Sequence, residues 1–256
     1  MNYYKNLANE LQEFLDFQRA KEKIMLRVVP YEDDLTEIPH RKFLNLIVTY
    51  YYMLSTEREI IPINNNHVAK WKIRESDLYR AAMENTLQRL PAVLESAEDY
   101  MFKALVESME EDSIKTKKDF GILVMQLFGI NLEDKELDLI WENESYNVGK
   151  IKDIIIARAV NKKNMYILSN RLRIYGAVAL VFPKCLKDAA DYIGSDLYII
   201  LASIHELVIL PVDNNTKLEK LKSETLRASN EVIAPEDRLT SDIYIYERKN
   251  RTIKSV

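Results

Sequence analysis

The chain has 256 residues, of which 47% are hydrophobic and 30% are charged, and this composition is typical of a folded globular protein. Its 36 basic and 40 acidic residues leave a net charge of -4, too balanced for the concentrated positive field on which nucleic-acid binding depends. No apolar run reaches the roughly 18 residues that a membrane span requires, and the lone Cys185 excludes an internal disulfide and fits a reducing compartment. We therefore expect a cytoplasmic protein that binds neither nucleic acid nor membranes.

The first part of the chain predicts one helix and a small sheet. Apolar residues at helical spacing predict a helix over residues 3–23, and an apolar run predicts a strand over 24–30. Residues 43–54 alternate with a period of two, which is typical of a strand with one buried face. The short apolar run at 60–63 is expected to return beside this strand as a hairpin partner.

Two helices are predicted next, followed by a change of character. Residues 75–90 have helical spacing that ends at Pro91, and Ser96 with Asp99 resembles the capping box of a second helix. We expect both helices to pack on the first sheet. Residues 111–163 then alternate charge runs with apolar helical stretches, which indicates a helical insertion or linker.

The second half of the chain holds the densest run of apolar segments. Residues 175–182, 197–202 and 206–212 are short and apolar on both alternating faces, which predicts strands covered on both sides. Between the first two of them, Pro183 and Gly194 mark the start and the end of a helix.

An amphipathic helix over residues 216–229 and a last strand over 242–247 complete the chain, and the tail beyond Lys249 is expected to fray. Together the assignments predict an α+β fold with two sheet-containing lobes and amphipathic helices. The lobes are residues 1–110 and 164–256, with the helical insertion 111–163 between them. The C-terminal lobe is expected to have the order β-β-α-β-β-α-β.

Six stretches, taken in order, carry a family resemblance: IPHRKFLNL, NNNHVAKW, DLYRAAMENT, YILSNRLRIYGAVALVFPKCL, GSDLYIILASIHELVILP and LTSDIYIYER. This ordered set resembles an uncharacterised domain family of Firmicutes proteins, many of them from gut bacteria. The family is a domain of unknown function, so the resemblance implies no catalytic residues. The chain departs from the family pattern at Asn45, where Asp is usual, and at Leu201 and Ala202, where Pro-Ser is common. The resemblance also implies an additional N-terminal segment, which this chain is expected to lack.

The three histidines, His40, His67 and His205, lie inside these stretches and are the first candidates for chemistry. A metal site requires ligands that converge in space, and neither His40 nor His67 has a second ligand at i+3 or i+4. His205 and Glu206 begin the zinc-protease pattern H-E-x-x-H, but Ile209 occupies the second His position. We therefore expect no metal and no cofactor.

A hydrolase is the alternative function to weigh. Ser203, His205 and Glu206 contain the residue types of a catalytic triad, yet neighbouring residues of one strand point to opposite faces and cannot assemble one. A hydrolase would have to use His205 and Glu206 together with His40 or His67 from the other lobe. The sequence leans away from an enzyme.

Two groups of residues are candidates for binding. Asn170, Arg171 and Arg173 form a basic loop suited to an anion or an acidic partner segment, although loops commonly carry solvated charge. Tyr50 and Tyr52 offer aromatic faces on the long strand to a partner or a second copy, unless the first helix covers them. We expect an uncharacterised intracellular bacterial protein, a non-catalytic binding or protein-interaction module. It is expected to meet a protein partner or form a homodimer through its N-terminal lobe.

Overall fold

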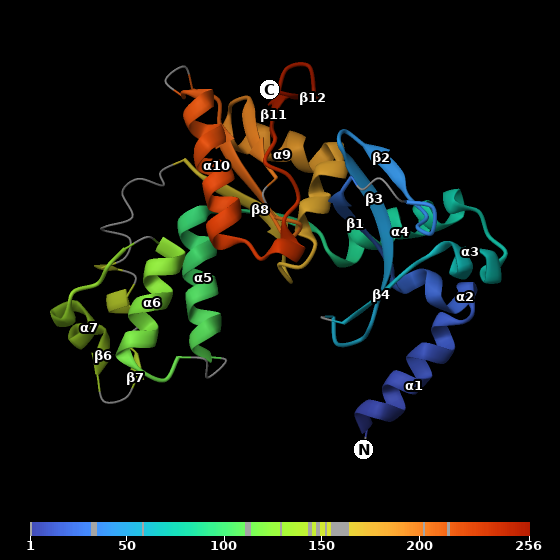
Figure 1. Ribbon diagram of the computed structural model, residues 1–256, viewed down its shortest axis with the longest axis horizontal. Coiled ribbons are helices and arrows are strands. Elements are labelled where there is room, and N and C mark those ends of the chain that lie inside the picture. Colours follow the sequence, from blue (N-terminus) through green and yellow to red (C-terminus); the bar gives the residue numbers. More distant parts are fainter. Residues whose placement is uncertain are drawn as a thin grey trace. The chain divides into compact units, whose positions relative to one another are not determined.

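The computed structural model describes residues 2–31, 35–57, 59–110, 114–128, 130–142, 145–146, 149–151, 153–154, 164–201, 203–213 and 216–256 (Figure 1). Its contacts divide the chain into two compact units. The first unit joins Met1–Leu94 to Leu168–Val256, and the second unit is Glu95–Ile167. This division differs from the segments 1–110, 111–163 and 164–256 inferred from the sequence, and the independence of those three segments stays a prediction.

The chain contains helices, a four-stranded sheet and a six-stranded sheet whose strand pairs are mainly antiparallel, so the expected α+β class is confirmed. The first sheet has the order β1-β3-β2, with β4 also paired to β3. Its strands are β1 (Ile24–Pro30), β2 (Arg41–Phe43), β3 (Leu46–Met53) and β4 (Ile60–Pro62). The strand expected over 43–54 is interrupted by a tight turn at Leu44 and Asn45, where Leu44 has φ 56°. All eight residues of β3 are buried, so both of its faces, and not one, pack against the rest of the unit.

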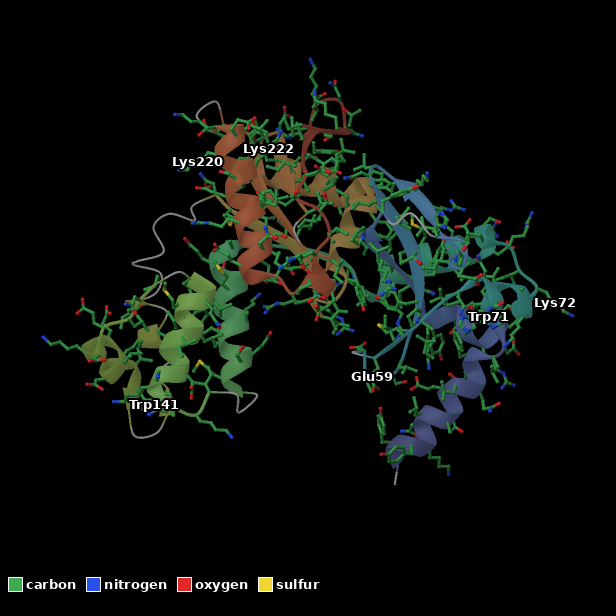
Figure 2. The ribbon with its side chains drawn as sticks, in the orientation of Figure 1. Glu59, Trp71, Lys72, Trp141, Lys220 and Lys222 are labelled. Carbon is green, nitrogen blue, oxygen red and sulfur yellow. The ribbon has the colours of Figure 1, made fainter. Side chains whose placement is uncertain are left out.

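The helix expected over residues 3–23 is divided into three pieces: α1 (Asn2–Phe14), α2 (Phe17–Ala20) and the 3₁₀ helix η1 (Lys21–Lys23). The break occurs because Asp16 leaves the helical conformation and its side chain accepts a hydrogen bond from Gln18 N–H, which starts a new helix. At the end of α1, Phe14 O accepts a hydrogen bond of 3.0 Å from the indole of Trp71, the last residue of α3 (Asn65–Trp71) (Figure 2).

Helix α4 (Glu75–Arg89) lies along β1, the outer strand of the first sheet. Leu26 N–H donates to Thr86 Oγ1 over 2.9 Å, and Asn85 Nδ2 donates to Ile24 O over 2.9 Å. Two side chains of the helix thus bond the strand's backbone. The expected packing of this helix on the first sheet is confirmed, whereas the next helix, α5 (Ala97–Glu110), falls in the second unit.

The second sheet has the order β12-β11-β9-β10-β8-β5. Its strands are β5 (Ala92–Ser96), β8 (Tyr166–Asn170), β9 (Leu197–Ile200), β10 (Leu207–Pro211), β11 (Ile243–Glu247) and β12 (Thr252–Ser255). Strand β5 was not expected from the sequence. The tail was expected to fray, but it forms β12, which pairs with β11 because the chain turns back on itself after Glu247.

The prediction of a strand over residues 175–182 is wrong. The segment forms a 3₁₀ helix, η3 (Gly176–Val181), in which all six residues are buried. A run that is apolar on every side has no periodicity to separate a strand from a buried helical turn. The order of the C-terminal lobe is therefore not β-β-α-β-β-α-β, because a 3₁₀ helix replaces the second strand and β12 is added at the end.

Helices α9 (Pro183–Ile193) and α10 (Leu218–Val232) complete the first unit, with a 3₁₀ turn η4 (Pro235–Asp237) after α10. The bounds expected for α9 are confirmed, since Pro183 starts it and Gly194, with φ 80°, caps it. Leu218 and Leu221 at the start of α10 pack on a cluster of buried residues of the second sheet, namely Tyr198, Ile200 and Ile243.

The second unit is built from α5, α6 (Lys117–Phe128), α7 (Asp134–Ile140) and the short pair β6 (Trp141–Glu142) and β7 (Ser145–Tyr146). It has its own buried cluster, which includes Leu105, Phe120, Val124, Ile140 and Ile151. Ser96 caps α5 as expected, because Asp99 N–H donates to Ser96 Oγ over 3.0 Å, and Asp99 Oδ2 accepts from Ser96 Oγ over 2.7 Å and not from the Ser96 backbone as in a full capping box. Among the helices of the described residues, none has the length and the apolar composition to cross a membrane.

Candidate functional site

His205 lies at the centre of a hydrogen-bonded cluster between β9 and β10. Its Nδ1 accepts a hydrogen bond of 3.2 Å from Tyr175 N–H, so the ring proton is on Nε2. Nε2 lies 3.1 Å from Asp237 Oδ1, to which it donates. The Tyr175 ring stacks on the imidazole with 5.7 Å between the ring centroids. Both ring nitrogens are therefore occupied by the protein itself.

The serines near His205 bond its backbone and not its ring. Ser203 Oγ accepts from His205 N–H over 3.0 Å, and Ser169 Oγ donates to His205 O over 2.7 Å. Glu206 lies half-buried just before β10. A nucleophilic serine needs a base with a free ring nitrogen, and His205 has none. The hydrogen bonds of the cluster stabilise the turn at Tyr175. Tyr175 has φ 52° in this turn, a backbone conformation that is unfavourable for a residue other than glycine.

The other two histidines serve local structure elsewhere in the first unit. His40 Nδ1 donates to Ile38 O over 2.8 Å. His67 Nδ1 accepts from Asn64 N–H over 3.1 Å in the capping box of α3, and its ring packs edge-on against Phe14. Burial lowers the pKa of His67, so its ring stays neutral at pH 7. Within the described parts of the chain, no group of three His, Cys, Asp or Glu side chains is placed to hold a metal ion.

The basic loop residues have partners within the protein. Asn170 is buried, its Oδ1 accepts from Leu172 N–H over 3.0 Å, and its Nδ2 donates to Ile174 O over 2.8 Å. Arg171 forms an ion pair of 2.9 Å with Glu57, in the turn before β4. Arg173 has φ 54°. The loop is thus tied to itself and to the first sheet.

Tyr50 and Tyr52, the residues expected to meet a partner, are both fully buried, at 0% exposure. Tyr50 donates a hydrogen bond to Glu75 Oε1, and Glu75 is also paired with Arg41 over 2.8 Å. The ring of Tyr52 lies edge-on to Phe14 of α1, with 5.1 Å between centroids. The chain's own elements, including the first helix, cover this face of β3, so the two side chains present no surface to a second protein.

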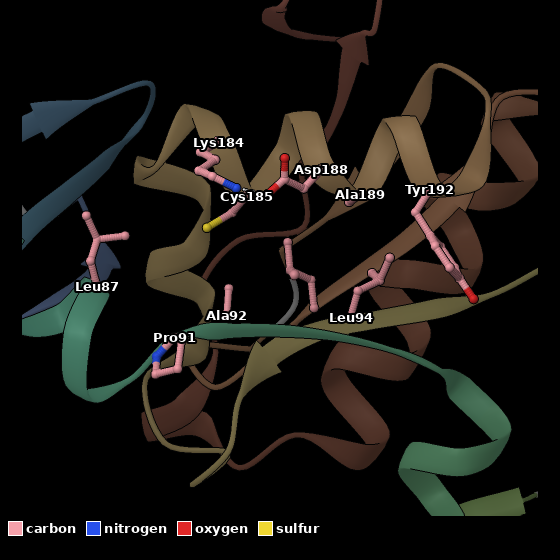
Figure 3. Close-up of a pocket in the computed structure, with 10 residues that line it drawn as sticks. Leu87, Pro91, Ala92, Leu94, Lys184, Cys185, Asp188, Ala189 and Tyr192 are labelled. Carbon is pink, nitrogen blue, oxygen red and sulfur yellow. Dashed lines mark hydrogen bonds and ion pairs between the residues drawn. The ribbon is translucent and has the colours of Figure 1, made fainter.

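A groove of about 450 Å³ lies between α9 and the start of β5 (Figure 3). All of its lining residues belong to the first unit. The strand contributes Ala92 and Leu94, two residues apart and therefore on one face. The helix contributes Lys184, Asp188 and Tyr192, at the four-residue spacing of one helical face. The remaining lining residues are mostly apolar: Leu87, Pro91, Leu168, Cys185 and Ala189.

The thiol of Cys185 lines this groove without the properties of a nucleophile. Burial raises the pKa of Cys185, and the carboxylate of Asp188 raises it further, while Lys184 acts in the opposite direction. The thiol is therefore protonated at neutral pH, and the thiolate is the reactive form of cysteine. The sequence interpretation of Cys185 as a packing residue agrees with this environment.

Sequence reasoning missed the groove because it missed β5, which forms one of its two walls. The run AVL after Pro91 is too short to separate from the end of the preceding helix, although its position between Pro91 and the Ser96 cap was a possible signal. Asp237, the partner of His205, was also missed, because 32 positions along the chain separate it from the histidine and nothing local relates the two.

Comparison with known proteins identifies a family but no activity. The model of DUF5688, described as a family of unknown function, matches residues 2–248. No curated protein and no solved structure matches the chain.

Proposed function

Because the chain belongs to the DUF5688 family, whose description assigns no function, we propose from its own residues that it is a non-catalytic binding module. Its ligand is an extended, largely uncharged peptide segment of another protein, and its site is the groove between α9 and β5. The observation that carries the proposal is this groove, which has a helix as one wall and the outermost strand of the second sheet as the other.

An outermost strand leaves backbone N–H and C=O groups without a strand partner on one side. An extended peptide can pair with such an edge and place alternate side chains into the groove beside it. Ala92 and Leu94 of β5 and Ala189 of α9 supply an apolar lining for those side chains. A volume of about 450 Å³ lies within the usual range of ligand sites.

The charges on the rim support an uncharged ligand. Lys184 pairs with Asp188 one turn later on α9, and outside the groove lining Lys187 pairs with Asp191 over 2.6 Å in the same way. Each cation is compensated by its neighbouring anion, so the helix offers no excess charge to attract a charged segment. Tyr192, 76% exposed, supplies an aromatic side chain of the kind found at binding hot spots.

The groove is stronger support for a binding function than His205 and Glu206 are for a hydrolase. A hydrolase of that kind needs His40 or His67 beside His205, and each of those two rings is bonded instead to a neighbouring backbone group. The same proposal places the protein inside the cell, where the lone Cys185 thiol stays reduced.

Selection of peptides from a random displayed library tests the proposal. We expect the selected peptides to have apolar residues at alternate positions and to protect Cys185 from alkylation, which is measured as a single mass adduct because the chain has one cysteine. The substitution Leu87→Asp places a charge in the groove and is expected to weaken their binding about tenfold or more, which corresponds to ~1.4 kcal/mol.

The matched control is Leu226→Asp. Leu226 is 50% exposed and Leu87 is 45% exposed, and both lie on helices, but Leu226 is on α10 and does not line the groove. Binding by the control should equal that of the unchanged protein. Peptides that bind both variants equally, or a library that yields no binders protecting Cys185, would contradict the proposal.

A further inference from the structure

Arg27 and Tyr51 lie on the same face of the first sheet. The register of β1 and β3 places Met25 opposite Tyr51 and Arg27 opposite Thr49. Residues two apart on a strand share a face, so the side chain of Arg27 is a diagonal neighbour of the side chain of Tyr51. Neither residue belongs to the groove described above.

One aromatic ring contacts both of them. The guanidinium carbon of Arg27 lies 5.4 Å from the centroid of the Tyr175 ring, and the Tyr51 and Tyr175 ring centroids are 5.1 Å apart. Tyr175 is held in place by its backbone bond to His205 and by stacking on the imidazole. The three side chains therefore form a fixed cluster, which we call the Arg27 cluster.

The Arg27 cluster contains donors without acceptors. Tyr51 is 1% exposed, and its hydroxyl has no hydrogen-bond partner among the described residues. The Nε of Arg27 is also buried and without a partner among them. A buried donor left unpaired is costly, and Arg27 Nε is such a donor although the residue as a whole is only partly buried.

The electrostatic environment of the Tyr51 hydroxyl is positive. Burial raises its pKa, and the neighbouring Tyr175 hydroxyl raises it further, so the phenol is a protonated donor at neutral pH. The charged groups that act on it are the guanidinium groups of Arg27 and Arg89. Arg89 also donates to Glu22 O over 3.1 Å.

We propose that the Arg27 cluster binds a small oxyanion, either a free phosphate or a free carboxylate. The Nε edge of the guanidinium presents two parallel N–H groups to two oxygens of one anion, which is the usual side-on geometry of arginine. The Tyr51 hydroxyl donates a third hydrogen bond. The anion supplies the acceptors and the negative charge that the described protein does not.

Thermal unfolding in phosphate, in acetate and in chloride at matched ionic strength tests the proposal. We expect phosphate or acetate to raise the Tm above its value in chloride by about 3 °C or more, because a ligand of the folded state stabilises it. A shift with phosphate alone identifies a phosphate, and a shift with acetate alone identifies a carboxylate. Broadening of the ³¹P resonance of inorganic phosphate reports binding of that ion independently of unfolding.

The variants Arg27→Gln and Tyr51→Phe should lose both the Tm shift and the broadening. In chloride, Tyr51→Phe should melt at or above the Tm of the unchanged protein because it removes an unpaired buried hydroxyl, and in the oxyanion it should melt below it. Arg27→Lys keeps the charge but removes the paired N–H edge, and it replaces Arg27→Gln if that variant does not fold.

The control is Tyr52→Phe. The Tyr52 hydroxyl is also buried, but Tyr52 follows Tyr51 on β3 and so faces the opposite side of the sheet. This variant should keep the full shift. The absence of any oxyanion effect on the unchanged protein, or an effect that survives both Arg27→Gln and Tyr51→Phe, would overturn the proposal.

Discussion

Gly176 occupies a position where no side chain can be placed. A Cβ atom there would lie 2.2 Å from Ser169 Oγ, 2.5 Å from His205 O and 2.8 Å from Ser169 Cα. Two of these three atoms belong to the backbone, so they cannot move aside cheaply. The glycine is what allows η3 to approach β8 and the His205 turn closely.

We therefore predict that Gly176→Ala destabilises the fold by about 3 kcal/mol or more. Gly121→Ala is the control, since a Cβ at that position in α6 meets only Leu137 carbons at 3.7 Å. It should stabilise the protein by about 0.5–1 kcal/mol, because alanine favours a helix over glycine. Chemical denaturation measures both values, and equal effects of the two substitutions would contradict the prediction.

Glu10 connects α1 to two other elements through one buried carboxylate. Its Oε1 accepts from Lys23 Nζ over 2.9 Å, from Ser55 N–H over 2.9 Å and from Ser55 Oγ over 2.5 Å. Burial alone raises the pKa of Glu10, but the hydrogen bonds from Ser55 and Lys23 outweigh it and hold the pKa below the ordinary 4.5. The ionised form is therefore favoured by folding.

Glu10→Gln is predicted to lower the free energy of unfolding by about 1–3 kcal/mol at pH 7. Because the folded-state pKa is lowered, the contribution of Glu10 is complete above the ordinary value of 4.5 and is lost as the pH falls below it. The difference between the two proteins should thus shrink on acidification. Urea unfolding at pH 7 and at acid pH measures it, and a difference that stays constant would refute this role of Glu10.

At the scale of elements, side chains of α4 form hydrogen bonds with backbone groups of β1, a strand at the edge of the first sheet. Thr86 accepts from Leu26 N–H over 2.9 Å and donates to Ala82 O over 2.7 Å, so one hydroxyl joins the helix to the strand. Thr86 and Leu26 are both buried, at 1% and 0% exposure. Water therefore cannot replace the hydroxyl if it is removed.

Thr86→Val keeps the shape of the side chain and leaves Leu26 N–H unpaired, which should cost about 1–3 kcal/mol of stability. Hydrogen exchange of the Leu26 amide should accelerate in this variant. Thr225→Val is the control, because Thr225 is also buried on a helix but donates to or accepts from no strand within the described chain. A Thr86→Val protein with unchanged Leu26 exchange would contradict the assignment.

At the scale of the molecule, the first unit is assembled from two separate stretches of chain. Arg171 pairs with Glu57, and Tyr175 contacts Tyr51, so residues more than 100 positions apart hold it together. The chain passes from the first unit to the second within β5 and returns within β8. These two strands are adjacent in the sheet, and next to them Ala97 N–H donates to Met165 O over 2.9 Å.

Replacing residues 98–164 by a short Gly/Ser linker is therefore predicted to leave a folded first unit, because the linker has little distance to span. Circular dichroism and a cooperative thermal transition check the outcome. Limited proteolysis is also expected to cut between residues 110 and 163, and the two fragments should then stay together in size-exclusion chromatography. A shortened chain without tertiary structure would show that the first unit depends on the second, and fragments that separate would show that the two stretches of the first unit need their covalent connection.

Local chemistry accounts for the elements that the sequence predicted well. Pro183 and Gly194 bound α9, Ser96 and Asp99 start α5, and the apolar run of residues 24–30 becomes β1. In each case the deciding residues lie within a few positions of one another, and their hydrogen bonds and dihedral preferences act within the segment itself.

The remaining features arise from contacts between distant residues. The apolar run at 176–181 becomes η3, which closely approaches His205 and Ser169 at Gly176, and the pattern of the run does not reveal this contact. The same holds for the pairing of β5, for the hydrogen bond of His205 to Asp237 and for the meeting of Arg27 with Tyr175. The identity of the residues fixes which groups can bond, but only the folded backbone brings partners that are far apart in the chain within bonding distance.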